Sequence, residues 1–162
     1  MPGQGNRRDG DCARRIVRHD WSWLKVWAQD PVVDLRLGPV DAEWFEHVLG
    51  EDQGVELVVE DGRGRPIGLV GCVWDPTGDA HVISDLCVDP ARRRAGLGRR
   101  SLKAALSWAG HPEPRRWIAF IDEKNAPARE FFHSMGWEDQ GMDAWLIRVS
   151  LPLVSGPDDH RC

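Results

Sequence analysis

VDPARRRAGLG, residues 88–98, joins a strand to a helix through an arginine-rich glycine turn, and this junction decides the fold. Pro90 interrupts the strand that ends at Val88, and an amphipathic helix is predicted directly after the turn. Glycine lets the backbone approach a ligand closely and adopt positive φ. The first amides of a helix lack internal partners and lie at the positive end of its dipole. The junction therefore predicts an anion site, of which phosphate is the usual occupant.

The positive charge of the chain is concentrated at this turn. The 162 residues carry a net charge of −5, yet residues 92–100 hold five arginines and no acid, so removing those five charges leaves −10 on the rest of the chain. An acidic protein is not typical of general nucleic-acid binders, and we expect no nucleic acid as a partner. One basic turn favours a small anionic ligand, and a solvated basic surface is the competing interpretation.

Two common phosphate motifs do not match the turn. A Walker A loop ends in Gly-Lys-Ser/Thr, which is absent here. A dinucleotide fingerprint needs a third glycine where Ser101 stands, and it belongs to an early βαβ unit, whereas hairpin strands precede this turn.

Length and composition indicate one domain of ordinary globular type. The chain is 41% hydrophobic and 29% charged, and no apolar run approaches the roughly 20 residues that span a bilayer. We expect a flexible arm over 1–12, a single domain over 13–151 and a tail over 152–162, in a cytoplasmic protein without a membrane partner. The four cysteines are scattered without CxxC spacing, so no metal site is expected.

Hydrophobic periodicity and turn signals predict a mixed α/β (α+β) domain. Alternation favours a strand over 80–88, and apolar residues at helical spacing favour helices on either side of it. Asp30-Pro31 is expected to stop the first helix. The predicted strands are 15–18, 54–60, 66–74, 80–88, 117–121 and 144–151, and the predicted helices are 21–28, 42–49, 98–109 and 126–135.

A second block, NAPAREFFHSMGW at residues 125–137, completes a known pattern. Together the two blocks resemble V-x-P-x-x-(R/Q)-x-x-G-x-G/A and N-x-x-A-x-x-(F/L)-Y-x-x-x-G-F of the GNAT superfamily of N-acetyltransferases. The resemblance covers roughly residues 13–151, and the order and separation of the blocks make it specific. It implies a GNAT-type fold, in which a central splayed β-sheet is flanked by helices on both faces.

The resemblance also implies acetyl-CoA as the cofactor. The pyrophosphate would lie on the turn, and the pantetheine arm would pair with the end of the preceding strand, as an added strand does. A splay between that strand and residues 117–121 would admit the thioester. The implied cofactor-binding residues are Leu86, Cys87, Val88, Arg93, Arg94, Ala95, Gly96, Leu97, Gly98, Arg99, Asn125, Phe131 and Phe132. Asn125 is equally well placed as a helix N-cap.

Similar enzymes transfer acetyl directly to an amine, with a base that removes an ammonium proton and a backbone amide, here of Val88 or Cys87, that holds the oxyanion. No glutamate stands on the strand over 80–88. Asp85 and His81 share a predicted face and are the candidate bases, against structural roles for both. Direct transfer favours a packing role for Cys87 over a nucleophilic one.

The general acid of similar enzymes is a tyrosine, and this chain contains none. Phe132 stands at the equivalent position, which leaves Ser134 or a water as candidates. Loss of such a group costs about 10² to 10⁴ in rate. A CoA thiolate leaves readily near neutral pH, so an enzyme remains the main hypothesis. The alternative is a non-catalytic acyl-CoA sensor of the same fold.

The acceptor is predicted to be a primary amine of a small molecule or a peptide N-terminus. Residues 20–49 resemble the aminoglycoside and ribosomal-protein N-terminal acetyltransferase branches. Their tryptophans, with nearby carboxylates, would suit a cationic amine, although helix stripes of this kind usually belong to the core. The candidate acceptor residues are Trp23, Trp27, Trp44 and Trp74. A homodimer is compatible with the resemblance, and nothing in the sequence requires one.

Overall fold

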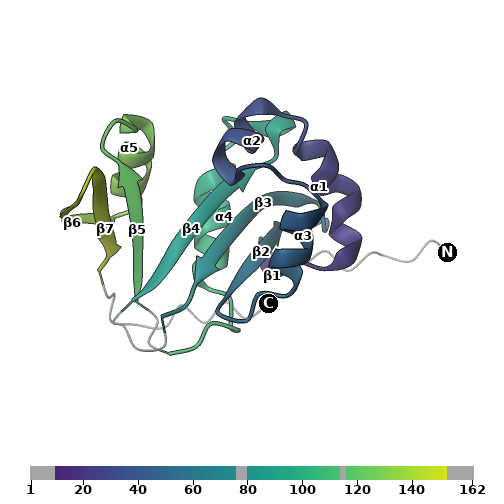
Figure 1. Ribbon diagram of the computed structural model, residues 1–162, viewed down its shortest axis with the longest axis horizontal. Helices are drawn as coiled ribbons and strands as arrows, with labels where there is room; N and C mark the ends of the chain where they lie inside the picture. The colour runs from purple at the N-terminus through teal and green to yellow at the C-terminus, as the bar shows by residue number, and fades with distance from the viewer. Residues whose placement is uncertain (1–9, 76–79, 114–115, 153–162) are drawn as a thin grey trace.

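The computed structural model describes residues 10–75, 80–113 and 116–152. Almost all of the predicted arm over 1–12 and tail over 152–162 therefore lies outside the described residues. The described chain forms a seven-stranded sheet in the order β1-β2-β3-β4-β5-β7-β6 (Figure 1). Every neighbouring pair is antiparallel except β4 and β5, which are parallel.

The predicted elements are present, with small shifts at their ends. The strands are β1 (Cys12–Arg15), β2 (Gly54–Glu60), β3 (Pro66–Val73), β4 (His81–Val88), β5 (Trp117–Asp122), β6 (Glu138–Asp143) and β7 (Leu146–Leu151). The helices are α1 (Trp21–Trp27), α2 (Pro31–Leu37), α3 (Ala42–Leu49), α4 (Leu97–Leu106) and α5 (Ala126–Ser134). None of the described helices combines the length and the apolar character that crossing a membrane requires.

Helices cover both faces of the sheet, as predicted. On one face α1, α2 and α3 pack on Val58, Leu69 and Cys87, which makes the cluster that we call the front core. On the other face α4 and α5 pack on a larger cluster that includes Val70, Ile83 and Val149, which we call the back core. Figure 1 shows α1 to α3 in front of the sheet and α4 behind it.

Three elements differ from the sequence prediction. Asp30-Pro31 ends α1 but also begins α2, because the Asp30 carboxylate accepts from the amides of Val32 and Val33 while Pro31 occupies the first helical position. β6 was not predicted because all six of its residues are exposed, so it lacks the apolar alternation that marks a strand. β1 covers Cys12–Arg15, so it shares only Arg15 with the strand predicted over 15–18, and a 3-10 helix begins at Arg18.

A β-bulge in β4 changes which side chains share a face. Gly71 of β3 pairs with Asp85 and Cys72 pairs with Ile83, so Ser84 is an extra residue between them. Ile83 consequently faces the back core, whereas Cys87 faces the front core. The bulge reverses the alternation that the sequence predicted beyond Ser84.

Candidate functional site

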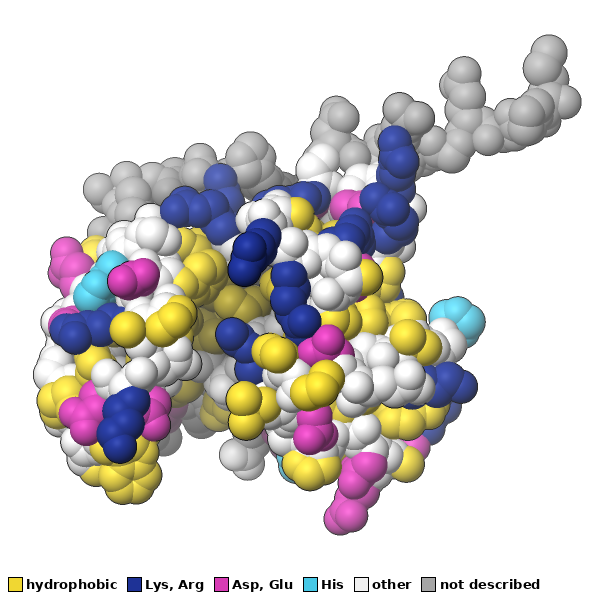
Figure 2. All heavy atoms as spheres, turned by 90° about the horizontal axis from the view of Figure 1, so that it is seen from above, with side chains coloured by type: hydrophobic (Ala, Val, Ile, Leu, Met, Phe, Trp, Pro, Cys, Tyr) yellow, Lys and Arg dark blue, Asp and Glu magenta, His cyan; other side chains and the backbone are white. Residues whose placement is uncertain are grey.

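β4 and β5 are paired at one end and separate at the other. His81, Val82 and Ile83 pair with Trp117, Ile118 and Ala119, and beyond Ile83 the described chain adds no strand partner on that side of β4. Figure 1 shows the two strands diverging toward α5 and α2. Seen from above, Figure 2 shows a hollow between the β5–β7 half and the rest, with a hydrophobic floor and Lys and Arg side chains on one rim. The backbone of Leu86, Cys87 and Val88 therefore has one hydrogen-bonding edge available, as the predicted pantetheine contact requires.

The turn after β4 leads directly into α4, a helix without a side-chain N-cap. Arg94 and Gly96 both adopt left-handed backbone conformations, with φ of 66° and 71°. α4 begins at Leu97, and its N-cap, Gly96, has no side chain to accept the first amides. A Cβ atom on Gly98 would lie 3.4 Å from the Phe131 ring, which brings α5 against the start of α4. These amides form the concave donor surface that binds phosphate in other proteins.

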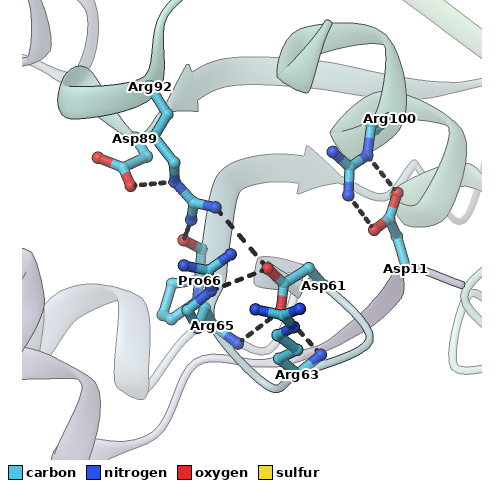
Figure 3. Close-up of polar contacts among 8 residues, drawn as sticks. All are labelled: Asp11, Asp61, Arg63, Arg65, Pro66, Asp89, Arg92 and Arg100. Carbon is cyan, nitrogen blue, oxygen red and sulfur yellow. Dashed lines mark hydrogen bonds and ion pairs between the residues drawn. The ribbon is translucent and has the colours of Figure 1, made fainter. Parts of the chain in front are cut away.

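Three of the five arginines at the turn already have carboxylate partners. Arg93 makes a bidentate contact with Asp30, with Nη2–Oδ1 of 2.5 Å and Nη1–Oδ2 of 3.1 Å. Arg92 donates to Asp89 and to the carbonyl of Pro66, and Arg100 donates twice to Asp11 (Figure 3). These side chains stabilise the junction as well as charging it.

The remaining two arginines differ. Arg99 donates to the carbonyl of Ser134 at 2.9 Å and links α4 to α5. Arg94 makes no ion pair and no side-chain hydrogen bond with the part of the chain that the structure describes. The positive charge available to an anion therefore comes from Arg94, Arg99 and the helix N-terminus rather than from five equal arginines.

A buried pair of carboxyl groups lies where β4 and β5 separate. Glu56 of β2, Gly71 of β3 and Asp85 of β4 occupy one row across three adjacent strands. A Cβ atom on Gly71 would lie 2.3 Å from Asp85 Oδ2, so the missing side chain provides the space in which the two carboxyl groups meet. Ser84, on the bulge, is exposed and donates to Asp85 Oδ2 at 3.3 Å.

The two carboxyl groups change each other's ionisation. Burial and the neighbouring Asp85 raise the pKa of Glu56 well above its ordinary value. Burial also raises the pKa of Asp85, against the opposing effect of hydrogen bonds from Glu56, Ser84 and the Gly71 amide. The contacts that favour the ionised form, from Ser84 and the Gly71 amide, fall on Asp85 and not on Glu56.

Comparison with known proteins identifies the family. Residues 15–137 match the Acetyltransferase (GNAT) family. The chain belongs to this family. It is 28% identical over 141 residues to the mycothiol acetyltransferase of Thermomonospora curvata, a match that covers 78% of this chain and 43% of that protein. The chain spans less than half the length of the curated relatives it matches.

Solved structures of GNAT proteins share the fold. The spermidine N-acetyltransferase of Vibrio cholerae, solved with CoA and spermine, is similar with a TM-score of 0.68 and 14% identity, covering 87% of this chain and 94% of that one. An aminoglycoside acetyltransferase solved with coenzyme A and kanamycin gives a TM-score of 0.69 and 16% identity, covering 87% and 94%. At these identities the likeness establishes the fold, and the splayed sheet predicted from the sequence is confirmed.

Within this GNAT fold, the two candidate bases lie apart. The expectation that His81 and Asp85 share a face is wrong, because the bulge at Ser84 places Asp85 on the front-core side and His81 beside Trp117 of the back core. His81 is 1% exposed. Its Nδ1 accepts from the Asp75 amide at 3.3 Å, and its Nε2 lies 3.0 Å from the Pro112 carbonyl. Both ring nitrogens are thus committed to the backbone, at the end where the strands are paired.

The residues predicted on α5 lie beside the opening. Asn125 caps α5 by accepting from the Ala128 amide at 3.2 Å, so the N-cap interpretation is confirmed. Phe132, at the position of the family's tyrosine, is 8% exposed and packs against Phe131 and Trp137. Ser134 is exposed, and its hydroxyl already donates to the Phe131 carbonyl at 2.7 Å.

The four candidate acceptor tryptophans divide between two places. Trp23, Trp27 and Trp44 belong to the front core, on the same face as Asp85, and Trp27 is only 7% exposed. The Trp23 indole donates to buried Asp20 at 2.9 Å. Trp74 lies instead against the back core and donates to His111 at 3.2 Å. Trp74 therefore lies on the opposite face of the sheet from the other three.

Glu56 is the residue that sequence reasoning missed. It stands in the apolar run GVELVVE, where one carboxylate among buried positions is the signal that a partner lies nearby. The partner could not be found without the register, because Asp85 lies 29 positions away and the bulge determines its face. Gly71 is a second missed signal, since it leaves room for the pair.

Proposed function

We propose that the chain is an acetyltransferase that moves acetyl from acetyl-CoA directly to a primary amine of a small molecule or a peptide N-terminus. One observation carries this proposal. The separation of β4 from β5 leaves an open strand edge, which is followed along the chain by an uncapped helix N-terminus, and Asp85 stands on the same stretch of β4. Family membership agrees with it, and the acetyltransferase names of the relatives support the reaction class.

The residues present fit coenzyme A. The free amides from Leu97 to Arg99 and the unpaired Arg94 suit the pyrophosphate. The open edge of Leu86, Cys87 and Val88 suits an extended pantetheine arm, and we propose that the amide of Val88, which alternation directs to that edge, polarises a carbonyl. When bound, acetyl-CoA supplies a thioester as the acyl donor.

Asp85 is the candidate proton acceptor. The new bond joins the amine nitrogen to the acyl carbon and the carbon–sulfur bond breaks. The ammonium must first give up one proton, and the nitrogen releases a second one to solvent as the thiolate leaves. Because Ser84 is exposed and donates to Asp85, its hydroxyl can pass its proton to Asp85 Oδ2 while it accepts one from the amine. His81 has no such role here, since both of its ring nitrogens bind backbone groups.

The proton for the departing thiolate has no dedicated donor among the predicted residues. Phe132 has no hydroxyl, and the Ser134 hydroxyl donates to the Phe131 carbonyl. We propose that a solvent proton serves, because a thiolate is a stable leaving group near neutral pH. The same observation favours the second candidate function, an acyl-CoA sensor without turnover.

The acceptor is proposed to be a cation. Asp85 lies on the sheet face that holds Trp23, Trp27 and Trp44. A carboxylate and aromatic surfaces both attract ammonium groups. The names of similar proteins mention mycothiol, spermidine and aminoglycosides, which guides the choice of compounds to test.

A thiol-release assay with acetyl-CoA tests the proposal. The panel contains spermidine, spermine, kanamycin, the acceptor of the mycothiol acetyltransferases and a short peptide with a free α-amino group. We expect amine-dependent release of CoA with at least one of them, and a product heavier by one acetyl group.

Calorimetry with CoA is the companion measurement. Tight CoA binding without thiol release on any amine would favour the sensor over the enzyme. Absence of CoA binding would reject both candidate functions, since both require the splay and the α4 N-terminus to hold the cofactor.

A further inference from the structure

We propose that Glu56 is a positioning residue for this reaction: as a neutral carboxylic acid it donates a hydrogen bond to Asp85 and holds that carboxylate ionised beside the opening between β4 and β5. The inference rests on the proposed function of Asp85. Glu56 lies on β2, two strands away from β4, and it does not line the opening itself. Its effect on the reaction would therefore pass through Asp85.

The backbone builds the pair. Register places Glu56, Gly71 and Asp85 in one row, and alternation places Glu56 on the same face as Val58 of the front core. Without the bulge at Ser84, Asp85 would project toward the other face. Without glycine at position 71, a Cβ atom would occupy the space of the Asp85 carboxyl. Three independent features of the chain thus converge on one contact.

In the part of the chain that the structure describes, one oxygen of each carboxyl group lacks a hydrogen-bond partner, which argues against both groups being ionised at once. Glu56 is 6% exposed, and its Oε1 and Asp85 Oδ1 are both buried without a hydrogen-bond partner among the described residues. Two adjacent carboxylates in this setting would repel strongly with no cation to offset them. One retained proton removes the repulsion and makes the hydrogen bond between them.

The groups that face the pair supply no positive charge. From β3 and β4 come the Gly71 amide and the Ser84 hydroxyl. The neighbouring thiol is Cys72, and burial together with both carboxyls raises its pKa, so it stays neutral. From α2 and the glycine turn, Arg36, Arg93 and Asp30 act on Cys87, where burial raises the pKa to about 11. None of these three forms an ion pair with either carboxyl of the pair.

The first test measures stability against pH and needs no activity. Unfolded Glu56 releases its proton above pH 4.5, whereas folded Glu56 keeps it. A raised folded pKa means that stability is complete below the unfolded pKa and is lost as pH rises toward the folded one. Wild-type unfolding should therefore become more favourable by up to about tenfold per pH unit above 4.5, relative to Glu56→Gln, which cannot ionise.

The second test measures kcat against pH with the amine found in the panel. Glu56→Gln preserves a neutral hydrogen-bond donor, so we expect kcat within about threefold and an unchanged acidic limb. Glu56→Leu removes the donor, so the acidic limb should move up by about one pH unit, with activity recovering at higher pH. Glu60→Gln is the matched control, because it makes the same change on the same strand without contacting Asp85, and it should leave the limb in place.

The outcomes distinguish failure of the Glu56 role from failure of the proposed acetyltransferase function. Equal stability slopes for wild type and Glu56→Gln would overturn the retained proton, whether or not turnover is found. Equal losses of kcat at every pH for Glu56→Gln and Glu56→Leu would indicate a structural role only and would also overturn the proposal. If no amine is acetylated, the proposed function fails while the stability measurement still decides whether the pair shares a proton.

Discussion

Among the residues that the structure describes, polar groups are hydrogen-bonded at one end of β4 and some lack partners at the other. At the paired end, His81 is buried with both ring nitrogens bound to backbone groups, and the Trp117 ring packs against it. At the separated end, within the described ranges, Asp85 Oδ1 has no hydrogen-bond partner, the strand edge beyond Ile83 is open, and α4 has no side-chain cap. Folding alone would favour satisfying these groups, so unsatisfied groups gathered at one end mark where a ligand is expected.

The difference also separates two candidate bases that look alike in sequence. A spacing of four positions on one strand suggests that His81 and Asp85 share a face, and the extra residue Ser84 places them on opposite faces. His81 contributes to the stability of the closed end, whereas Asp85 contributes charge at the open end. The following experiments test this division, from the largest expected effect to the smallest.

Asp85→Asn should cause the largest loss. It keeps the size of the side chain but removes the proton acceptor, so kcat in the thiol-release assay should fall by about 10² to 10⁴. CoA affinity measured by calorimetry should stay within twofold. A variant that retains wild-type kcat would remove Asp85 from the mechanism.

Gly96→Asp should weaken CoA binding by about tenfold or more. It places a carboxylate at the N-terminus of α4, where repulsion of about 1.4 kcal/mol corresponds to a factor of ten in Kd. Gly136→Asp is the control, because Gly136 also has positive φ and open space around its Cα but follows the C-terminus of α5. Unchanged CoA binding in Gly96→Asp would reject the cofactor site.

Gly71→Ala should lower kcat on the order of tenfold by displacing the Asp85 carboxyl. Gly68→Ala provides a matched comparison on the same strand, because its Cβ atom would meet Ser101 Oγ at 1.9 Å on the opposite face. Both changes should destabilise the fold by about 1–3 kcal/mol through overpacking. Only the first should change kcat measured well below the unfolding temperature, and equal kcat in the two variants would contradict this division of faces.

His81→Phe should leave kcat and its pH dependence unchanged. Loss of the two imidazole nitrogens leaves the Pro112 carbonyl and the Asp75 amide without those contacts, which should cost about 1–3 kcal/mol in the free energy of unfolding. Urea unfolding measures the stability, and a pH–rate profile measures the reaction. A shift in the acidic limb of the pH–rate profile would indicate that His81 takes part in the proton transfer.

The sequence was sufficient for the fold because its signals are local. The turn over 88–98, the hairpin over 54–74 and the block over 125–137 each carry their own glycine, proline and apolar pattern. Pro31 misled because the same residue that stops one helix is a good first residue of the next. β6 gave no signal because none of its side chains is buried.

The candidate site was predictable only where it is made of backbone. Glycines and the uncapped helix are visible in the chain order, so the cofactor side follows from the motif. The Glu56–Asp85 pair depends on a three-strand register and a bulge, which are set by packing between distant segments. The ion pairs of Arg93 and Arg100 were missed for the same reason, since their partners Asp30 and Asp11 lie more than sixty positions away.

Those ion pairs bear on how ionic strength acts on the protein. An anion that recruits Arg93 must take it from Asp30, so one counter-ion replaces another and little charge is newly neutralised. Binding that gains its energy from neutralising free cations weakens steeply with added salt, whereas an exchange of partners does not. The affinity for CoA should therefore fall with rising salt as it would for one or two free cations, far less steeply than five neighbouring arginines would suggest.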